Sequence, residues 1–255
     1  MFILYKDIKN FEIEASNGSK GRVRDFYFDD KTWEIRYLVV KSGFLFNTSE
    51  SLITTAHLRT PDLKENKLTL TLTKEQIEDA ANPEEDPPVS TQHERAVAKL
   101  QAEAIPPVAI GLPGVAYTPA LAERELFGED GEDRIDDDVT HTTSDPHLRS
   151  MDEISGYSLA ARDDNIGAIS DFILNPDTWQ VRYVVADTGN WLPGRQVAIK
   201  PEWINEIRWD DQRILVDVTK ETVETAPELS DLQELERSAA DLVVSHYGAY
   251  GAVPM

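Results

Sequence analysis

Hydrophobic and polar residues over much of this chain are grouped in the way that is typical of short β-strands. Residues 23–28 and 33–40 are dense in β-branched and aromatic side chains, and the polar residues 29–32 separate them. Two such segments around a four-residue polar stretch predict a β-hairpin.

The hairpin pattern occurs twice. A shift of 146 positions aligns residues 21–43 with residues 167–189, and 9 of these 23 positions are identical. The offset continues without a gap to the Thr-Lys-Glu triplets at 73–75 and 219–221. A repeat at a fixed offset indicates two copies of one small domain.

The hairpin register follows if residues 29–32 form the loop. Phe28 then lies opposite Trp33. The predicted core face of the hairpin carries Phe26, Phe28, Trp33, Ile35, Tyr37 and Val39. We expect both Trp33 and its counterpart Trp179 to pack in the core, with a ligand-stacking surface as the alternative.

The same register pairs the repeated charges. Asp25 lies opposite Arg36 in the first copy, and Asp171 lies opposite Arg182 in the second. We interpret them as cross-strand ion pairs on a half-buried face. A docking pair or a proton-relay element is the functional alternative.

Further strands and helices complete the predicted organisation. Strands are expected at 51–54, 67–72, 196–200 and 213–218, and helices at 92–104 and 229–245. The predicted parts of this mainly β chain are a first repeat at 1–81, an acidic linker with a short helix at 82–150, a second repeat at 151–226, and a C-terminal helix and tail at 227–255.

Charge limits the classes of partner. The chain has 255 residues and a formal net charge of −22, so its field repels phosphate backbones, and no nucleic-acid partner is expected. No apolar run approaches the roughly 20 residues that a membrane-spanning helix needs. Because residues 1–11 also hold too short an apolar core for a signal peptide, we expect a soluble, cytoplasmic protein.

The linker carries much of the charge. Residues 82–150 contain 15 acids and 5 Lys or Arg, and the run at 129–138 is too charged to bury. We expect a solvated segment. Deleting residues 129–138 should therefore leave the melting temperature of the protein nearly unchanged in a thermal melt, and a drop of many degrees would show that the run is structural.

The sequence contains no recognised catalytic, nucleotide-binding or metal-binding motif. There is no nucleophile elbow, phosphate-binding loop or dinucleotide fingerprint, and the absence of cysteine excludes thiol nucleophiles and Cys-ligated metals. The acidic run 129–138 does not have EF-hand spacing, and His141 and His147 do not have zinc spacing. We expect no catalytic residues, no cofactor and no metal.

Three tryptophans are particular to the second copy. Trp191, Trp203 and Trp209 stand where the first copy has Leu45, His57 and Leu63. Two interpretations stay open for these indoles: core packing within the second copy, or a contact with the first copy or another molecule.

The repeat resembles the PRC-barrel domain, which is named for the cytoplasmic domain of the photosynthetic reaction-centre H subunit. The resemblance rests on Gly-x-hydrophobic-x-Asp-Phe followed by Trp-x-hydrophobic-Arg-Tyr-hydrophobic-Val, present at 21–39 and again at 167–185. It implies two small antiparallel β-barrels with short helices after each. The membrane helix of the H subunit is not present in this sequence.

The resemblance also suggests a role. Members of the family act mainly as assembly or interaction modules, so we expect a non-catalytic protein whose partner is another protein, with a second copy of this chain as one candidate. The candidate contact residues are Trp191, Trp203, Trp209, Asp25, Arg36, Asp171 and Arg182. The alternative is a peripheral accessory protein of a photosynthetic or other membrane electron-transfer complex that aids assembly or proton transfer.

Overall fold

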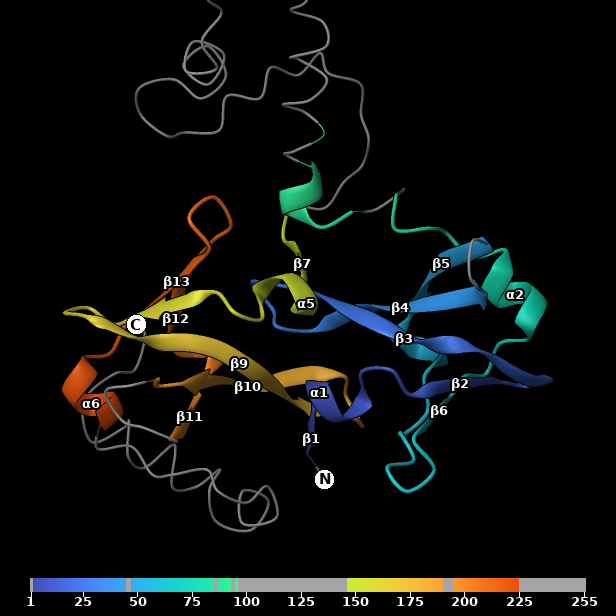
Figure 1. Cartoon of the computed structure of the whole chain (residues 1–255), viewed down its shortest axis with the longest axis horizontal. Coiled ribbons are helices and arrows are strands. Elements are labelled where there is room, and N and C mark those ends of the chain that lie inside the picture. Colours follow the sequence, from blue (N-terminus) through green and yellow to red (C-terminus); the bar gives the residue numbers. More distant parts are fainter. Residues whose placement is uncertain are drawn as a thin grey trace, which may run out of the picture.

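The computed structural model describes residues 2–44, 47–84, 87–92, 95, 146–189 and 195–224. Its strands form two sheets, one for each copy of the repeat, as predicted (Figure 1). No helix in these ranges is long and apolar enough to cross a membrane.

The sheet of the first copy has the strand order β5-β4-β3-β2-β6. Its strands are β2 (Glu12–Ala15), β3 (Gly18–Asp29), β4 (Ile35–Phe44), β5 (Asn47–Thr54) and β6 (Lys67–Thr69). Neighbouring strands are antiparallel except β2 and β6, which are parallel. The sheet is therefore mainly, but not entirely, antiparallel.

The sheet of the second copy has the order β11-β10-β9-β8-β13-β12. Its strands are β8 (Ser158–Ala160), β9 (Asn165–Asn175), β10 (Gln180–Asp187), β11 (Gln196–Ile199), β12 (Ile204–Arg208) and β13 (Arg213–Val216). The parallel pair is β8 with β13, which matches β2 with β6. β12 extends this copy, because the first copy has only isolated bridges at the equivalent place.

Short helices lie between and after the strands. They are α1 (Tyr5–Ile8), α2 (Lys74–Glu78), α5 (Met151–Ile154), α6 (Lys220–Glu224) and the 3-10 turns η1 (Thr55–His57) and η2 (Pro201–Trp203). The repeated Thr-Lys-Glu triplets begin α2 and α6, and Thr73 forms a capping box with Gln76 at α2. The predicted helix at 229–245 and most of the one at 92–104 lie outside the described residues.

The predicted hairpin is present, but its predicted register is wrong. Phe28 lies opposite Ile35 and not opposite Trp33. The reason is the turn, where the Trp33 N–H donates to the Asp29 carbonyl at 2.8 Å and Trp33 takes a left-handed φ of 59°. Trp179 repeats this conformation with a φ of 52°. Each tryptophan thus belongs to the turn rather than to the strand.

The predicted core face is also partly wrong. Four of its residues are buried in the main core: Phe26, Phe28, Trp33 and Ile35. Tyr37 and Val39 lie instead with a second cluster on the other face, and Val23, Leu38 and Val40 take their place in the main core. Register shifts between β3 and β4 cause this change, because a one-residue slip turns a side chain to the opposite face.

The two copies exchange their N-terminal strands. β1 (Ile3–Leu4) precedes the first sheet but pairs with β9, and β7 (Leu148–Ser150) precedes the second sheet but pairs with β3. The two pairings are equivalent under the 146-residue offset. Figure 1 shows the result, with α1 beside β9 and α5 beside β3. Each copy is thus completed by a segment of the other.

Reciprocal backbone hydrogen bonds join the two hairpins. The Ile35 N–H donates to the Trp179 carbonyl at 2.8 Å, and the Val181 N–H donates to the Trp33 carbonyl at 2.9 Å. These bonds also map onto each other under the offset. The copies are therefore related by an approximate two-fold axis that passes between the hairpins.

Aromatic rings fill the space between the copies. Phe26 stacks on Trp179 with 5.5 Å between ring centroids, and Phe28 packs against Phe172 at 6.0 Å. Tyr5 meets Phe26 and Phe172 edge-on, each at 6.2 Å. One main core consequently runs through both copies.

The repeated glycines have a steric cause. Gly21 has a φ of +78°, and a Cβ there would lie 2.3 Å from the Lys41 carbonyl oxygen. Gly167 has a φ of +127°, and a Cβ would lie 1.9 Å from the Asp187 carbonyl oxygen. Both positions therefore require glycine, where the neighbouring strand approaches closely.

Candidate functional site

A buried carboxylate, Asp25 on β3, lies where the first copy meets α5 of the second. It is 6% exposed. Its Oδ1 accepts hydrogen bonds from the backbone N–H groups of Phe26 (2.7 Å) and Asp152 (3.0 Å) and from the Tyr5 hydroxyl (3.1 Å). Its Oδ2 accepts one from the Ser150 hydroxyl at 2.5 Å. Four donors therefore compensate the burial of this group.

Asp171 on β9 holds the equivalent position and is 5% exposed. Within the described part of the chain it accepts two hydrogen bonds, from the backbone N–H groups of Lys6 (3.1 Å) and Phe172 (2.8 Å). The bond from Lys6 corresponds to the bond that Asp152 donates to Asp25. The function common to both aspartates is thus structural: each fixes the helix exchanged from the other copy.

The surroundings of the two aspartates differ. Three polar residues near Asp25 have a different counterpart near Asp171: Tyr5 corresponds to Met151, Ser150 to Leu4 and Arg24 to Ser170. The hydroxyl groups and the guanidinium beside the repeated aspartate are therefore particular to the Asp25 side.

An ion-pair network adjoins Asp25. Asp152 accepts a hydrogen bond from Arg24 Nη1 at 2.6 Å and pairs with Lys9 Nζ, and Arg24 also lies 3.9 Å from a Glu50 oxygen. Partial burial acts to raise the pKa of Asp152, but the hydrogen bonds from Lys9 and Arg24 outweigh it and hold that pKa below its usual range. Asp152 is therefore ionised at neutral pH.

A cavity of about 430 Å³ opens beside this network, within the size range of ligand sites. Three acids line it, namely Asp25, Asp152 and Glu153, together with one cation, Arg24. Glu153 accepts hydrogen bonds from the Ser90 hydroxyl at 2.5 Å and from the Tyr157 hydroxyl at 2.6 Å. We refer to this cavity as the Asp25 cavity.

Aromatic side chains from both copies form other parts of its wall. Tyr27 comes from the first copy, and Tyr157 and Trp209 come from the second. Trp209 lies in the turn between β12 and β13, the extension that the first copy does not share as a strand. The Asp25 cavity thus combines residues of both copies with Pro88, Ser90 and Thr91, which follow the first copy.

Burial controls the protonation of Asp25. Desolvation raises the pKa of Asp25 to about 6, although the hydrogen bonds from Ser150, Asp152 and Phe26 oppose the rise. The pKa of Tyr5 is raised, chiefly by burial and then by the charge of Asp25, so its hydroxyl stays protonated and donates. Asp25 therefore titrates near neutral pH inside a network of hydroxyl groups.

This titration predicts a pH-dependent stability. Between about pH 4 and pH 6 the native Asp25 keeps a proton that the unfolded chain has lost, so the contribution of Asp25 to the free energy of unfolding should fall as pH rises through this window, by up to roughly 3 kcal/mol. Asp25→Asn should lack this fall. Urea denaturation at a series of pH values measures the difference between the two proteins, and parallel pH profiles would contradict the assignment.

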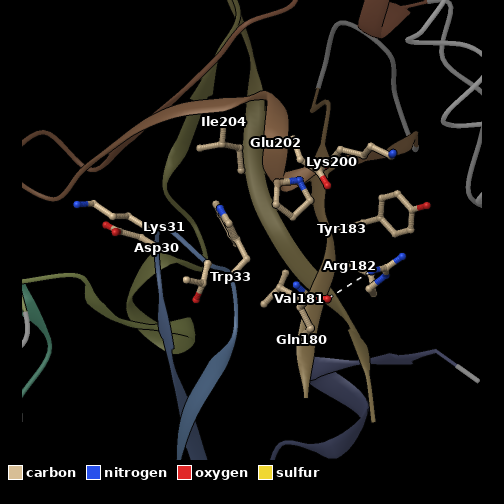
Figure 2. A pocket seen from close by; sticks show the side chains of 12 residues that line it. Asp30, Lys31, Trp33, Gln180, Val181, Arg182, Tyr183, Lys200, Glu202 and Ile204 are labelled. Atoms are coloured by element: carbon tan, nitrogen blue, oxygen red, sulfur yellow. Dashed lines mark hydrogen bonds between the residues drawn. The ribbon is translucent and has the colours of Figure 1, made fainter. Parts of the chain in front are cut away.

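A second, larger cavity of about 560 Å³ lies between the hairpin of the first copy and β10 of the second. Figure 2 shows Lys31 extending to one side of it, and Lys200 and Arg182 extending to the other. The three cations therefore do not converge on a common point. Asp30 at its rim is already paired with Arg149 at 2.6 Å. The charged side chains at this cavity are therefore not arranged to bind one charged ligand.

The predicted ion pairs between repeated charges are not formed. Asp25 lies opposite Val39. Arg36 pairs instead with Asp29, at 3.3 Å from its Oδ2, close to the turn. The shift in register that moves Trp33 into the turn also separates Asp25 from Arg36.

The second copy departs from the prediction in the same way. Asp171 lies opposite Val185. Arg182 is exposed, and its Nη1 donates to Gln180 Oε1 at 3.4 Å. Neither arginine is thus close to the repeated aspartate of its own copy.

The predicted contact tryptophans separate into different environments. Trp203 is 6% exposed and belongs to the main core, with Lys200 Nζ 5.7 Å from the centre of its ring. Trp209 is half-buried and lines the Asp25 cavity. Trp191, like the acidic run 129–138 and His141, lies outside the described residues.

Metal-binding groups are not found in the described ranges. No group of three His, Asp or Glu residues there is arranged to hold a metal ion. His147 Nδ1 lies 3.1 Å from an oxygen of Asp30. His141 and residues 129–138 lie outside the described ranges, so the expectation that they bind no metal stays a prediction.

Sequence reasoning missed Tyr5, Ser150 and Asp152 as parts of a site. A signal was present, because the 146-residue offset extends to residues 5–8 and 151–154, where Tyr5 aligns with Met151 and Ile8 aligns with Ile154. Within that match the polar differences between the copies mark the site. Comparison of the two copies for divergence, rather than identity, would have found it.

Comparison with known proteins agrees with the duplication. A family model described as the PRC-barrel domain matches the chain at residues 1–77 and again at 149–223. Domains of this type are generally non-catalytic interaction modules. No curated protein matches the chain.

Proposed function

The chain belongs to the PRC-barrel family, and we propose that it is a non-catalytic interaction or assembly module whose protein partner docks at the Asp25 cavity. The observation that carries this proposal is the divergence of the two copies around equivalent buried aspartates. Among the described residues, Asp171 accepts hydrogen bonds from two backbone N–H groups. Asp25 also accepts hydrogen bonds from two hydroxyls and lies beside an ion-pair network and a cavity.

The duplicated frame supports a docking role. Exchanged strands and a shared core fix the two copies relative to each other, so a cavity lined by both copies is held rigidly. A preformed site loses less entropy when a partner binds. Catalysis has no comparable support, since the sequence contains no nucleophile elbow, phosphate-binding loop or dinucleotide fingerprint.

The test is capture of the partner with a matched variant. Tagged full-length protein and the Trp209→Ala variant are expressed in the native host, and bound proteins are compared quantitatively by mass spectrometry. A partner lost from the variant supports docking at the cavity. Equal recovery from both proteins would refute this location, and sedimentation of the purified protein separates a second copy of the chain from a different partner.

A second candidate function is favoured by the chemistry of Asp25. A carboxyl group with a pKa of about 6, hydrogen-bonded to the Tyr5 and Ser150 hydroxyls, suits the transfer of protons near neutral pH. The corresponding role is that of a cytoplasmic accessory protein of a photosynthetic or other membrane electron-transfer complex. It draws on the likeness of the repeat to the reaction-centre H subunit.

Detergent extraction distinguishes this candidate from the first. Recovery of the tagged protein with a pigment–protein or quinone complex, and slower proton uptake by that complex when it carries Asp25→Asn, would support the accessory role. Asp171→Asn is the matched control. Recovery with soluble partners alone would remove the accessory role.

A further inference from the structure

We propose that the Asp25 cavity receives a basic side chain, arginine or lysine, presented by a protein partner. This inference rests on the proposed interaction role and specifies the chemistry of the partner. Charge, aromatic walls and one unpaired hydroxyl each support it independently.

The charge on the walls favours a cation. Three carboxylates line the cavity against one guanidinium, and that guanidinium, from Arg24, is already hydrogen-bonded to Asp152 at 2.6 Å. Lys9 also pairs with Asp152, so two cations stand against the three carboxylates and the remaining charge is negative. A formal net charge of −22 on the whole chain adds a long-range field that attracts basic segments and speeds their association.

The aromatic walls suit the same group. Tyr27, Tyr157 and Trp209 line the cavity together with the carboxylates. Ammonium and guanidinium groups are attracted to the faces of aromatic rings, and arginine also stacks on them. A wall made of both rings and carboxylates therefore matches a basic side chain better than an apolar or an anionic one.

One hydroxyl at the cavity, that of Tyr27, has no hydrogen-bond partner among the described residues. Tyr27 is 8% exposed, and no hydrogen bond joins its hydroxyl to any described residue. Burial, followed by the charge of Asp25, raises the pKa of Tyr27, so the hydroxyl is neutral and its oxygen can accept a hydrogen bond. The oxygen is accessible from the cavity rather than sealed in the core, so an N–H of a bound basic side chain can donate to it.

The experiment uses full-length protein and calorimetric titration at low salt. The probe is a capped Gly-Arg-Gly-Arg-Gly peptide, and the control probe carries citrulline, which is neutral and nearly the same shape, in place of arginine. We expect the arginine peptide to bind and Tyr27→Phe to weaken it by about tenfold, because that change removes one hydrogen bond to a charged group. The melting temperature of Tyr27→Phe should not fall, since no described residue is hydrogen-bonded to the hydroxyl.

A matched pair of charge variants separates a specific site from general attraction. Glu153→Gln, at the Asp25 cavity, should weaken binding of the arginine peptide by about tenfold. Glu202→Gln removes the same charge at the larger cavity and should change binding by less than about twofold.

Three outcomes would overturn the inference. They are equal affinity for the citrulline peptide, equal weakening by the two charge variants, and absence of binding by the arginine peptide. The proposed function is tested separately, by capture of a partner with the Trp209→Ala variant. If the peptide titration fails but the variant still loses a partner, docking at the cavity is supported and only the basic side chain is ruled out.

Discussion

Replacing Trp179 by alanine is expected to lower the free energy of unfolding by about 3–5 kcal/mol, the usual cost of removing a buried large aromatic side chain. The residue is 5% exposed, and its ring stacks on Phe26 of the other copy at 5.5 Å. Trp33→Ala should cost a similar amount, because Trp33 is 7% exposed and stacks on Phe28 at 5.1 Å. Guanidinium denaturation followed by circular dichroism measures both values.

The shape of the transition is as informative as its midpoint. Since one core runs through both copies, each variant should shift a single cooperative transition of the whole described unit. Trp209→Ala is the matched control, because this half-buried indole lines a cavity and should cost much less. Two separate transitions, or stability unchanged in Trp33→Ala and Trp179→Ala, would contradict the shared core.

Replacing Asp25 by alanine is expected to destabilise the protein by about 3–5 kcal/mol, because it leaves several buried donors without an acceptor. The donors are the Phe26 and Asp152 N–H groups and the Tyr5 and Ser150 hydroxyls. Loss of the bond to Asp152 also releases the end of α5 from the first copy. Chemical denaturation at pH 7 measures the change.

The duplication provides the control for Asp25. Asp171→Ala removes an acceptor from two backbone N–H groups in the described part of the chain, so it should cost less, about 2–3 kcal/mol. Asp25→Asn keeps an acceptor oxygen and should recover most of the loss. Equal effects of Asp25→Ala and Asp171→Ala would show that the hydroxyl network adds nothing to stability.

Much of the fold followed from the sequence pattern. The internal offset identified two copies, and alternating residues identified the hairpin and the later strands. Register could not be derived, because it depends on Trp33 taking a left-handed conformation that is uncommon for a bulky residue. The pattern of hydrophobic and polar residues carries no information about the sign of φ at one residue.

The exchange of β1 and β7 between the copies could not be predicted from the hydrophobic pattern either. β1 and β7 are two and three residues long, too short for a hydrophobic pattern to indicate which sheet each joins. Only the three-dimensional packing decides whether such a segment pairs within its own copy or with the other. The Asp25 cavity depends on that choice, because Ser150 and Asp152 reach Asp25 only through the exchange.

Site-specific photo-cross-linking in the native host tests the central claim most directly, namely that the cavity particular to one side of the duplicated unit is where a partner docks. A photoreactive amino acid replaces Trp209 in one protein and Leu63, its counterpart in the first copy, in another. The account predicts a discrete adduct with a partner from position 209 and none from position 63. No adduct at 209, or the same adduct from both positions, would contradict it.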